Sequence, residues 1–472
     1  MAPRRLSGFD ACFVYDERPE EAQHTLKVAF LSPEAGPAWS LERTRERISR
    51  RLAALPPLRW RMLRVPFDLH HPVCVDDPAL DLAYHVRRAA LPEPGGHREL
   101  VEWISELASH PLDPARPLWE LWLVERYEGS RVVAVLKMSH ALADGGETRA
   151  LLDGLFSESF RVAESGAAAP AAEPSRLALL RDALRDRVRD LPRLAKLVRP
   201  ALVAARRARA LRRQPAGGSA RITTLHAPWT PLCGPLDRRR AFDFASVSLD
   251  QAREVARAFD CTLNDVVLAT AAGAVRQHLE SRAALPDGPI LAYMPASIRE
   301  ADERGQWGNR VSTRALALPT HLADPVAQLR AVRAGAAEAK ADLALRRGAN
   351  FEDFMRFAPP SAVKGVSRIM RALVRLRRDL QPGVVVSSVA GPREPLRVEG
   401  GSLENFVSVG HLKYAAGLNI TTWSYAGRLN FALYACPRSI PDLARVAESV
   451  AVSFEALSKA AAREASRIRS PA

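Results

Sequence analysis

The sequence predicts an α/β protein made of two domains joined by a helical connector. Its 472 residues exceed the size at which a single hydrophobic core usually stops growing, so we expect two domains of about 200 residues each. Strand-like apolar runs alternate with helical patterns on both sides of a low-complexity, Ala- and Pro-rich stretch at 166–174, which is typical of a linker. We place the domain boundaries at 1–165, 166–220 and 221–472.

Hydrophobic periodicity locates the main elements. In the first domain an apolar run over 132–138 predicts a strand, and the pattern over 148–156 predicts an amphipathic helix. In the second domain a long helix is expected from about Thr262 and a final helix over 441–459. The expected strands of this domain are 242–249, 290–294, 311–318, 384–388, 418–424 and 428–434.

A strongly basic segment follows the linker. Residues 176–213 contain thirteen Arg or Lys and three Asp, a large share of the net charge of +15. Apolar residues recur every three or four positions, which predicts an amphipathic helix that Pro192 and Pro200 are expected to break into shorter pieces. Such a segment either lies on an anionic membrane or lipid droplet, or packs as a linker helix on the neighbouring domains. Because it has no aromatic residues for base stacking, nucleic acid is not an expected partner.

The most informative stretch is SHALADG at 139–145. It places His140 at the mouth of an apolar strand, with a carboxylate four residues later and a glycine that permits a sharp turn. Histidine exchanges a proton near neutral pH, and loops on rigid strands commonly carry catalytic groups, so His140 is a candidate general base. The pattern also allows a structural interpretation, in which Asp144 and Glu147 form a helix capping box and the histidine is a core residue.

Further short motifs follow one another along nearly the whole chain. They are LSGFD at 6–10, PLD and PLW at 111–119, ND at 264–265, PASIR at 295–299, GN at 308–309, SSVAGP at 387–392, and GLNI with SYAG at 417–427. Together with SHALADG, they resemble the motif set of the bacterial wax ester synthase/diacylglycerol acyltransferase family, whose active-site motif is HHxxxDG. That family belongs to the CoA-dependent acyltransferases, which include chloramphenicol acetyltransferase and the condensation domains of peptide synthetases.

The resemblance implies two chloramphenicol-acetyltransferase-like domains with an active-site tunnel at their interface. It also implies transfer of a long fatty acyl chain from acyl-CoA to diacylglycerol, with long-chain fatty alcohols as alternative acceptors. His140 would be the general base, Asp144 would hold the histidine loop by pairing with Arg299, and Gly145 would allow the turn. Acyl-CoA is then a substrate, and we expect no bound cofactor and no metal.

Two positions depart from the family motifs. Ser139 replaces the first histidine of HHxxxDG, and Ser388 replaces the asparagine of the family's SNVPGP motif. Because the second histidine is retained as His140, the change at 139 bears on acceptor preference and turnover more than on the reaction class. A separate pair, His70 and His71, has no aspartate at the motif spacing, and we interpret it as structural.

Other motif residues have both a functional and a structural interpretation. Thr262 and Asp265 have capping-box spacing, so Asn264 and Asp265 either begin a helix or assist catalysis. Ser387 and Ser388 are hydroxyl donors at the end of an apolar strand, where they would line the tunnel.

The PLW segment is an apolar wall. Pro117, Leu118 and Trp119 belong either to the core or to an acyl channel, and the core is the favoured interpretation. No apolar run approaches the ~20 residues of a membrane helix, and the N-terminus lacks the apolar region of a signal peptide. The expected location is therefore the cytoplasm, with peripheral attachment to membranes or lipid droplets.

Several enzyme classes find no support in the sequence. It contains no GxSxG elbow, P-loop or HExxH motif, and its five widely spaced cysteines predict reduced thiols rather than a disulfide framework. Two alternatives to the neutral-lipid acyltransferase stay open. One is a lipid-binding or droplet-coating protein without turnover, which the replacement at Ser139 keeps open. The other is a condensation-type enzyme that acylates another acceptor.

Overall fold

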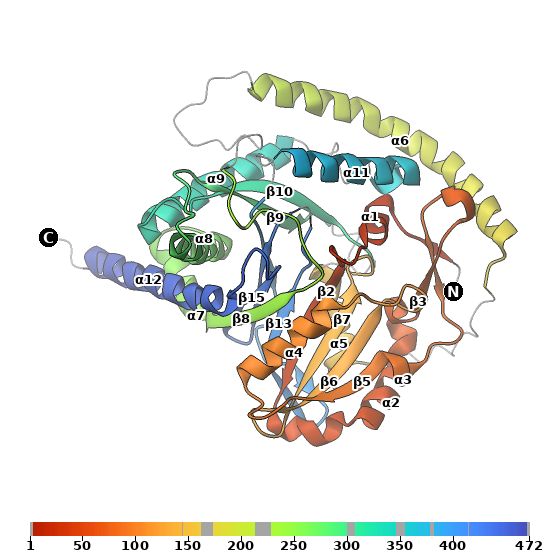
Figure 1. Cartoon of the computed structure of the whole chain (residues 1–472), viewed down its shortest axis with the longest axis horizontal. Coiled ribbons are helices and arrows are strands. Elements are labelled where there is room, and N and C mark those ends of the chain that lie inside the picture. Colours follow the sequence, from red (N-terminus) through yellow and green to blue (C-terminus); the bar gives the residue numbers. More distant parts are fainter. Residues whose placement is uncertain are drawn as a thin grey trace.

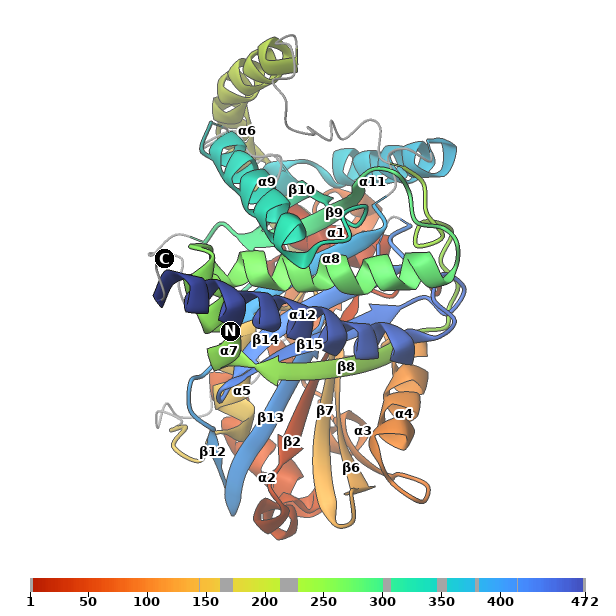
Figure 2. The ribbon, with the colours of Figure 1, turned by 90° about the vertical axis from the view of Figure 1, so that its left-hand side faces the viewer.

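Two six-stranded β-sheets form the centre of the molecule, and helices cover their outer faces (Figures 1 and 2). The computed structural model describes residues 3–143, 145–161, 173–212, 228–299, 307–345, 355–377, 382–413 and 415–469. The predicted mixed α/β, two-domain class is confirmed. The tunnel between the domains stays a prediction.

The first sheet carries the histidine loop at the end of its strand β7. Its strands, in spatial order, are β12 (Arg397–Val398), β13 (Gly401–Val409), β2 (His24–Leu31), β7 (Arg131–Ser139), β6 (Trp119–Tyr127) and β5 (Val86–Ala90). α4 (His97–Ser109) and strands of the second sheet pack on one face, while α2 (Leu41–Arg51) and α5 (Gly145–Phe156) pack on the other. Because both faces are covered, β7 is a continuous apolar run instead of an alternating one.

The second sheet is built from the C-terminal part of the chain. Its strands, in spatial order, are β10 (Val311–Leu318), β9 (Ile290–Ser297), β11 (Val384–Ala390), β14 (Leu418–Tyr425), β15 (Arg428–Ala435) and β8 (Ala241–Ser248). α7 (Leu249–Ala258), α8 (Leu263–Ser281), α9 (Pro325–Leu345) and α12 (Leu443–Arg469) bury their apolar sides on it. All six predicted strands are present, and the final helix extends ten residues beyond its predicted end at 459.

The C-terminal part of the chain contributes strands to the first sheet. β13 pairs antiparallel with β2, so residues from the C-terminal part complete the first sheet. A small third sheet of β1 (Arg4–Arg5), β4 (Val73–Asp76) and β3 (Trp60–Leu63) lies beside α1 (Gly8–Asp16). The boundaries at 165 and 220 stay a prediction, and the β13–β2 ladder ties the two domains together across any such division.

The basic segment forms one long helix, α6 (Arg176–Arg212), along the upper edge of the molecule in Figure 1. The expectation that Pro192 and Pro200 break it is wrong. A proline removes one backbone donor from a helix, and a long helix that lies on the surface can accommodate this loss by bending. α11 (Pro360–Leu376), which we did not predict, lies at the same end of the molecule (Figures 1 and 2).

Among the described helices, none alone has the length and apolar composition of a membrane span. α7 and α8 satisfy these criteria only as a pair bent by 101°. Most of α8 is buried against the second sheet, as expected for a core helix.

Candidate active site

The histidine loop is fixed at its start by the β-ladder. Ser139 pairs with His24 of β2, and its backbone N–H donates to the carbonyl of Leu118 at 2.9 Å. The N–H of His140 donates to the carbonyl of Gln23 at 2.8 Å. The Ser139 hydroxyl accepts a bond from the N–H of Ala141 at 3.3 Å, so the serine that replaces the family's first histidine stabilises the turn.

The His140 ring lies between aromatic groups from both ends of the chain. The residue as a whole is half-buried, and its ring Nδ1 is buried. The Phe13 ring from α1 stacks on it with centroids 4.6 Å apart and planes 10° apart. His411, which follows β13, meets it edge-on at 5.0 Å. These two neighbours restrict the orientation of the imidazole.

A buried asparagine attaches this loop to two other motifs. Asn309 Nδ2 donates to the His140 carbonyl at 2.7 Å and to Asp10 Oδ1 at 2.8 Å. The Asn309 N–H donates to the same Asp10 oxygen at 2.8 Å, and Ser7 caps the helix that carries Asp10. The LSGFD, SHALADG and GN motifs, up to 299 residues apart in the sequence, therefore meet at one point.

A buried ion pair joins the loop to the second sheet. Arg299 Nη2 lies 2.7 Å from Glu147 Oε2 and also donates to the Gly308 carbonyl at 2.7 Å. The two side chains are only 10% and 5% exposed. Asp144, the partner predicted for Arg299, lies outside the described residues, so that pairing stays a prediction. Gly145 begins α5, where Glu147 interacts favourably with the positive helix N-terminus.

Burial controls the protonation of the groups around the loop. It lowers the pKa of His411 well below its ordinary value, and the neighbouring His140 and Lys413 lower it further. Burial raises the pKa of Asp10, whereas the hydrogen bonds from Asn309 and Ser7 and the charge of Arg4 lower it. His411 is therefore a neutral neighbour of the candidate base at neutral pH.

The ND pair begins a helix, as its structural interpretation predicts. Thr262 caps α8, and the Asp265 carboxylate accepts from the Thr262 N–H at 2.8 Å. Asn264 Nδ2 contacts the sulfur of Met294 at 3.6 Å. Asp265 thus serves the helix start, while no contact connects either residue to the histidine loop within the described chain.

The PLW segment belongs mainly to the core. Trp119 is fully buried, stacks on His85 at 4.5 Å and donates its indole N–H to the Leu58 carbonyl at 2.7 Å. Pro117 is buried and Leu118 half-buried beside the start of the loop.

The two serines of the SSVAGP motif differ in exposure. They lie on β11 opposite Thr421 and Thr422 of β14; Ser387 is half-buried and Ser388 is exposed. Their role in lining a tunnel stays a prediction.

The histidines of the separate pair are both buried. His71 bonds to the Tyr15 hydroxyl at 2.9 Å and to the Ala358 carbonyl at 2.7 Å, and His70 lies 3.3 Å from Asp190 of α6. These contacts fit the structural interpretation. Among the described residues no group of three or more His, Cys, Asp and Glu is placed to hold a metal ion.

Sequence reasoning did not identify Phe13 and His411 as neighbours of the base. Neither belongs to a motif at a recognisable spacing from His140, so no local pattern indicates the contact. Asp10 and Asn309 do lie in the LSGFD and GN motifs, which is a signal that they matter, but their contact is visible only in the fold.

Comparisons with known proteins agree with this geometry. Residues 6–267 match the model described as the wax ester synthase/diacylglycerol acyltransferase catalytic domain, and residues 307–458 match the C-terminal domain of the same family. A Mycobacterium tuberculosis protein named as a candidate diacylglycerol O-acyltransferase is 34% identical over 467 residues, or 98% of each chain.

Solved structures show the same fold. The wax ester synthase/diacylglycerol acyltransferase from Marinobacter aquaeolei VT8 has a TM-score of 0.68 and 26% identity, covering 97% of this chain and 100% of that one. The first condensation domain of the calcium-dependent antibiotic synthetase has a TM-score of 0.58 and 17% identity, covering 98% and 97%.

The fold and the family matches define an acyltransferase of the chloramphenicol-acetyltransferase-like type. Within that type, the chain belongs to the wax ester synthase/diacylglycerol acyltransferase family.

Proposed function

We propose that this protein transfers a long-chain fatty acyl group from acyl-CoA to the hydroxyl of diacylglycerol, and also accepts long-chain fatty alcohols. The observation that supports this most is the half-buried His140 at the end of β7, on a loop held by Asn309 and located beside the Arg299–Glu147 ion pair. The loop is thus attached to the segments between β9 and β10 as well as to the first sheet, and this fixes the position of the proposed base.

His140 acts as general base in the proposed reaction. It takes the proton of the acceptor hydroxyl while the oxygen attacks the thioester carbonyl, which forms a tetrahedral oxyanion. When the C–S bond breaks, the departing sulfur receives that proton, and the products are an ester and free coenzyme A. No covalent enzyme intermediate, metal or resident cofactor enters this scheme.

An acceptor assay tests the proposal. Purified protein is incubated with palmitoyl-CoA and either diolein or hexadecanol, and both free thiol and ester product are measured. We expect triacylglycerol from diolein and wax ester from hexadecanol. Thiol release without either ester would point to a different acceptor, as in condensation-type relatives. A folded chain without thiol release under any of these conditions would favour the lipid-binding alternative, which Ser139 keeps open.

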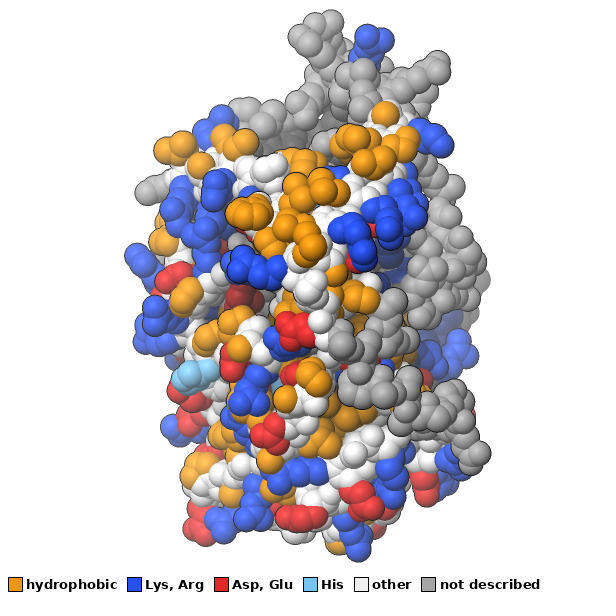
Figure 3. All heavy atoms as spheres, turned by 90° about the vertical axis from the view of Figure 1, so that its right-hand side faces the viewer, with side chains coloured by type: hydrophobic (Ala, Val, Ile, Leu, Met, Phe, Trp, Pro, Cys, Tyr) orange, Lys and Arg blue, Asp and Glu red, His pale blue; other side chains and the backbone are white. Residues whose placement is uncertain are grey.

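We further propose that the α6 end of the molecule contacts anionic membranes or lipid droplets, where such acceptors reside. In Figure 3 hydrophobic side chains gather near the top of the molecule with Lys and Arg side chains around them. Among the described side chains, the large apolar residues exposed on α6 and α11 are Leu177, Leu184, Val188, Leu191, Ile369, Met370, Leu373 and Leu376. A basic, apolar helix surface is what interfacial binding needs.

Vesicle flotation is expected to depend on both parts of this surface. The chain should float with vesicles that contain phosphatidylglycerol more than with phosphatidylcholine alone, and salt should weaken the association. Replacing Leu184, Val188 and Leu191 with serine should also weaken it, whereas Val452→Ser on the distant helix α12 is the matched control. Unchanged flotation after neutralising Arg206, Arg207, Arg212 and Arg213 would contradict the proposal that basic residues of this helix contribute to membrane binding.

A further inference from the structure

A pocket with many arginines lies between α6 and the body of the protein. Its volume is about 400 Å³. Its described lining comes from residues 4–10, 186–193, 298–299, 307–311 and 356–357, together with His70. α6 closes one side of the pocket, and the segments on either side of the GN motif form another.

The lining of this pocket, which we call the α6 pocket, is strongly positive. The described part includes seven arginines and three aspartates. The arginines are Arg4, Arg5, Arg189, Arg193, Arg299, Arg310 and Arg356. This excess of guanidinium groups in a concave site attracts anions and suits phosphate in particular, because the planar guanidinium donates two parallel bonds to it.

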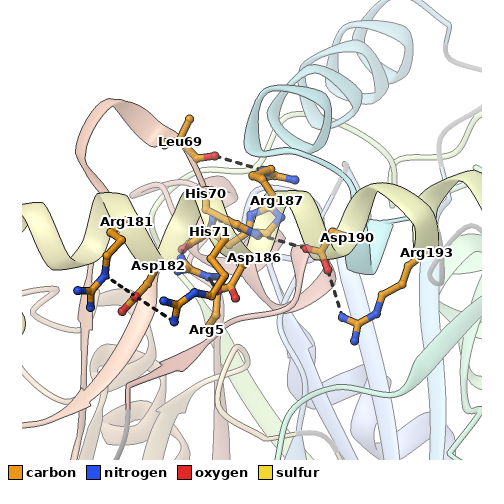
Figure 4. A network of polar contacts seen from close by, with 11 residues as sticks. Arg5, Leu69, His70, His71, Arg181, Asp182, Asp186, Arg187, Asp190 and Arg193 are labelled. Carbon is orange, nitrogen blue, oxygen red and sulfur yellow. Dashed lines mark hydrogen bonds and ion pairs between the residues drawn. The ribbon is translucent and has the colours of Figure 1, made fainter.

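The aspartates of the pocket already have partners (Figure 4). Asp186 pairs with Arg5 at 2.7 Å, and Asp190 lies 3.3 Å from both His70 and Arg193. These contacts fasten α6 to the body and keep its inner side in place over the pocket. Arg189, one residue before Asp190, is exposed and has no hydrogen bond or ion pair to any described residue.

A histidine in the wall of the pocket is kept neutral mainly by its burial. Burial lowers the pKa of His70 to about 3, and the charges of Arg187 and Arg5 act in the same direction. A neutral His70 leaves Asp190 as a negative group that holds Arg193 in place at the edge of the pocket.

The α6 pocket borders the contacts that hold the histidine loop. Arg299 and Asn309 belong to its wall, and Asn309 also holds the His140 carbonyl, whereas His140 itself does not line the pocket. An anion bound there would lie against residues that position the histidine loop. The proposed reaction involves one substrate with phosphates, because coenzyme A carries a diphosphate and a 3′-phosphate, and it takes place at a membrane surface that contains phospholipids.

We propose that the α6 pocket is a phosphate-binding subsite, with Arg189 and Arg193 of α6 as its outer ligands. This rests on the proposed function for the identity of the phosphate, which is either that of coenzyme A or that of an anionic phospholipid. A phosphate bound in this pocket would link the contact between α6 and the membrane to the occupation of the active site.

Ligand binding without turnover tests the subsite. The full-length chain and its Arg189→Gln/Arg193→Gln variant are titrated calorimetrically with coenzyme A, 3′-dephospho-coenzyme A and pantetheine. For the coenzyme A source we expect the variant to bind coenzyme A about a hundredfold more weakly, because two charge-assisted contacts are lost at about tenfold each, and to bind pantetheine unchanged. The Arg181→Gln/Arg185→Gln variant is the matched control, because these exposed arginines of the same helix do not line the pocket.

A second titration distinguishes the lipid source. Dihexanoyl phosphatidic acid and dihexanoylglycerol differ only by the phosphate, so a selective loss of phosphatidic acid binding in the Arg189→Gln/Arg193→Gln variant assigns the pocket to phospholipid. Equal binding of all phosphate ligands by variant and parent overturns the proposal. Neither titration requires acyl transfer. A folded chain without acyltransferase activity would therefore refute the proposed function, while these titrations would still decide whether the α6 pocket binds phosphate.

Discussion

Replacing His140 with alanine is expected to lower kcat for ester formation by about 10²–10⁴-fold, the usual contribution of a general base. The chain should still fold, because the loop keeps its backbone bonds to Gln23 and Asn309. The loss should fall on kcat more than on KM, since the proton moves only in the transition state. Thiol release from palmitoyl-CoA in the presence of diolein measures it.

A surface histidine provides the matched control. His110 is 65% exposed at the end of α4, and His110→Ala should leave kcat within about twofold of the parent because the side chain touches no part of the histidine loop. Melting temperatures of both variants separate a chemical loss from a folding defect. Full turnover by a folded His140→Ala chain would refute the assignment of this imidazole as the base.

The elements around His140 could be predicted because their signals are local. The apolar run of β7 and the amphipathic pattern of α5 each lie within about ten residues, and the capping box at Thr262 marks the start of α8 directly. The motif order indicated the family, and through it the fold. These signals involve neighbours along the chain, so no three-dimensional information was needed.

The contacts that complete the site could not be predicted, because they join distant segments. The Asn309–His140 bond spans 169 residues. His411 lies near the loop because β13, which precedes it, pairs with β2 of the first sheet. The segment 401–409 contains several polar residues, so apolar alternation does not predict this strand. Tertiary pairing, not local propensity, decides such strands.

Glu147 has a distant partner that its local sequence pattern does not indicate. Its spacing from Asp144 predicts a capping box, which concerns only the start of α5. In the structure the carboxylate also meets Arg299, 152 residues away, in the ion pair that joins the two domains. Sequence spacing alone does not reveal this partner.

Breaking this ion pair is the second change for which we expect a large effect. Arg299→Met leaves the Glu147 carboxylate buried without its guanidinium, and such a stranded charge typically costs about 3–5 kcal/mol of folding free energy. The side chains are 10% and 5% exposed, so water compensates little. Glu147→Leu should be similarly destabilising. Denaturant unfolding at neutral pH measures both, and acyl transfer should fall in each variant because Arg299 also holds the Gly308 carbonyl beside Asn309.

A double-mutant cycle decides whether the loss comes from the pair itself. If it does, the Arg299→Met/Glu147→Leu chain should be more stable than the sum of the single losses predicts by about 1–3 kcal/mol, since neither charge is then stranded. The exposed pair Arg333–Asp260, at 2.8 Å with 50% and 94% exposure, is the control, and its disruption should cost less than about 1 kcal/mol. Strictly additive losses at Arg299 and Glu147 would mean that the two side chains stabilise the loop independently of each other.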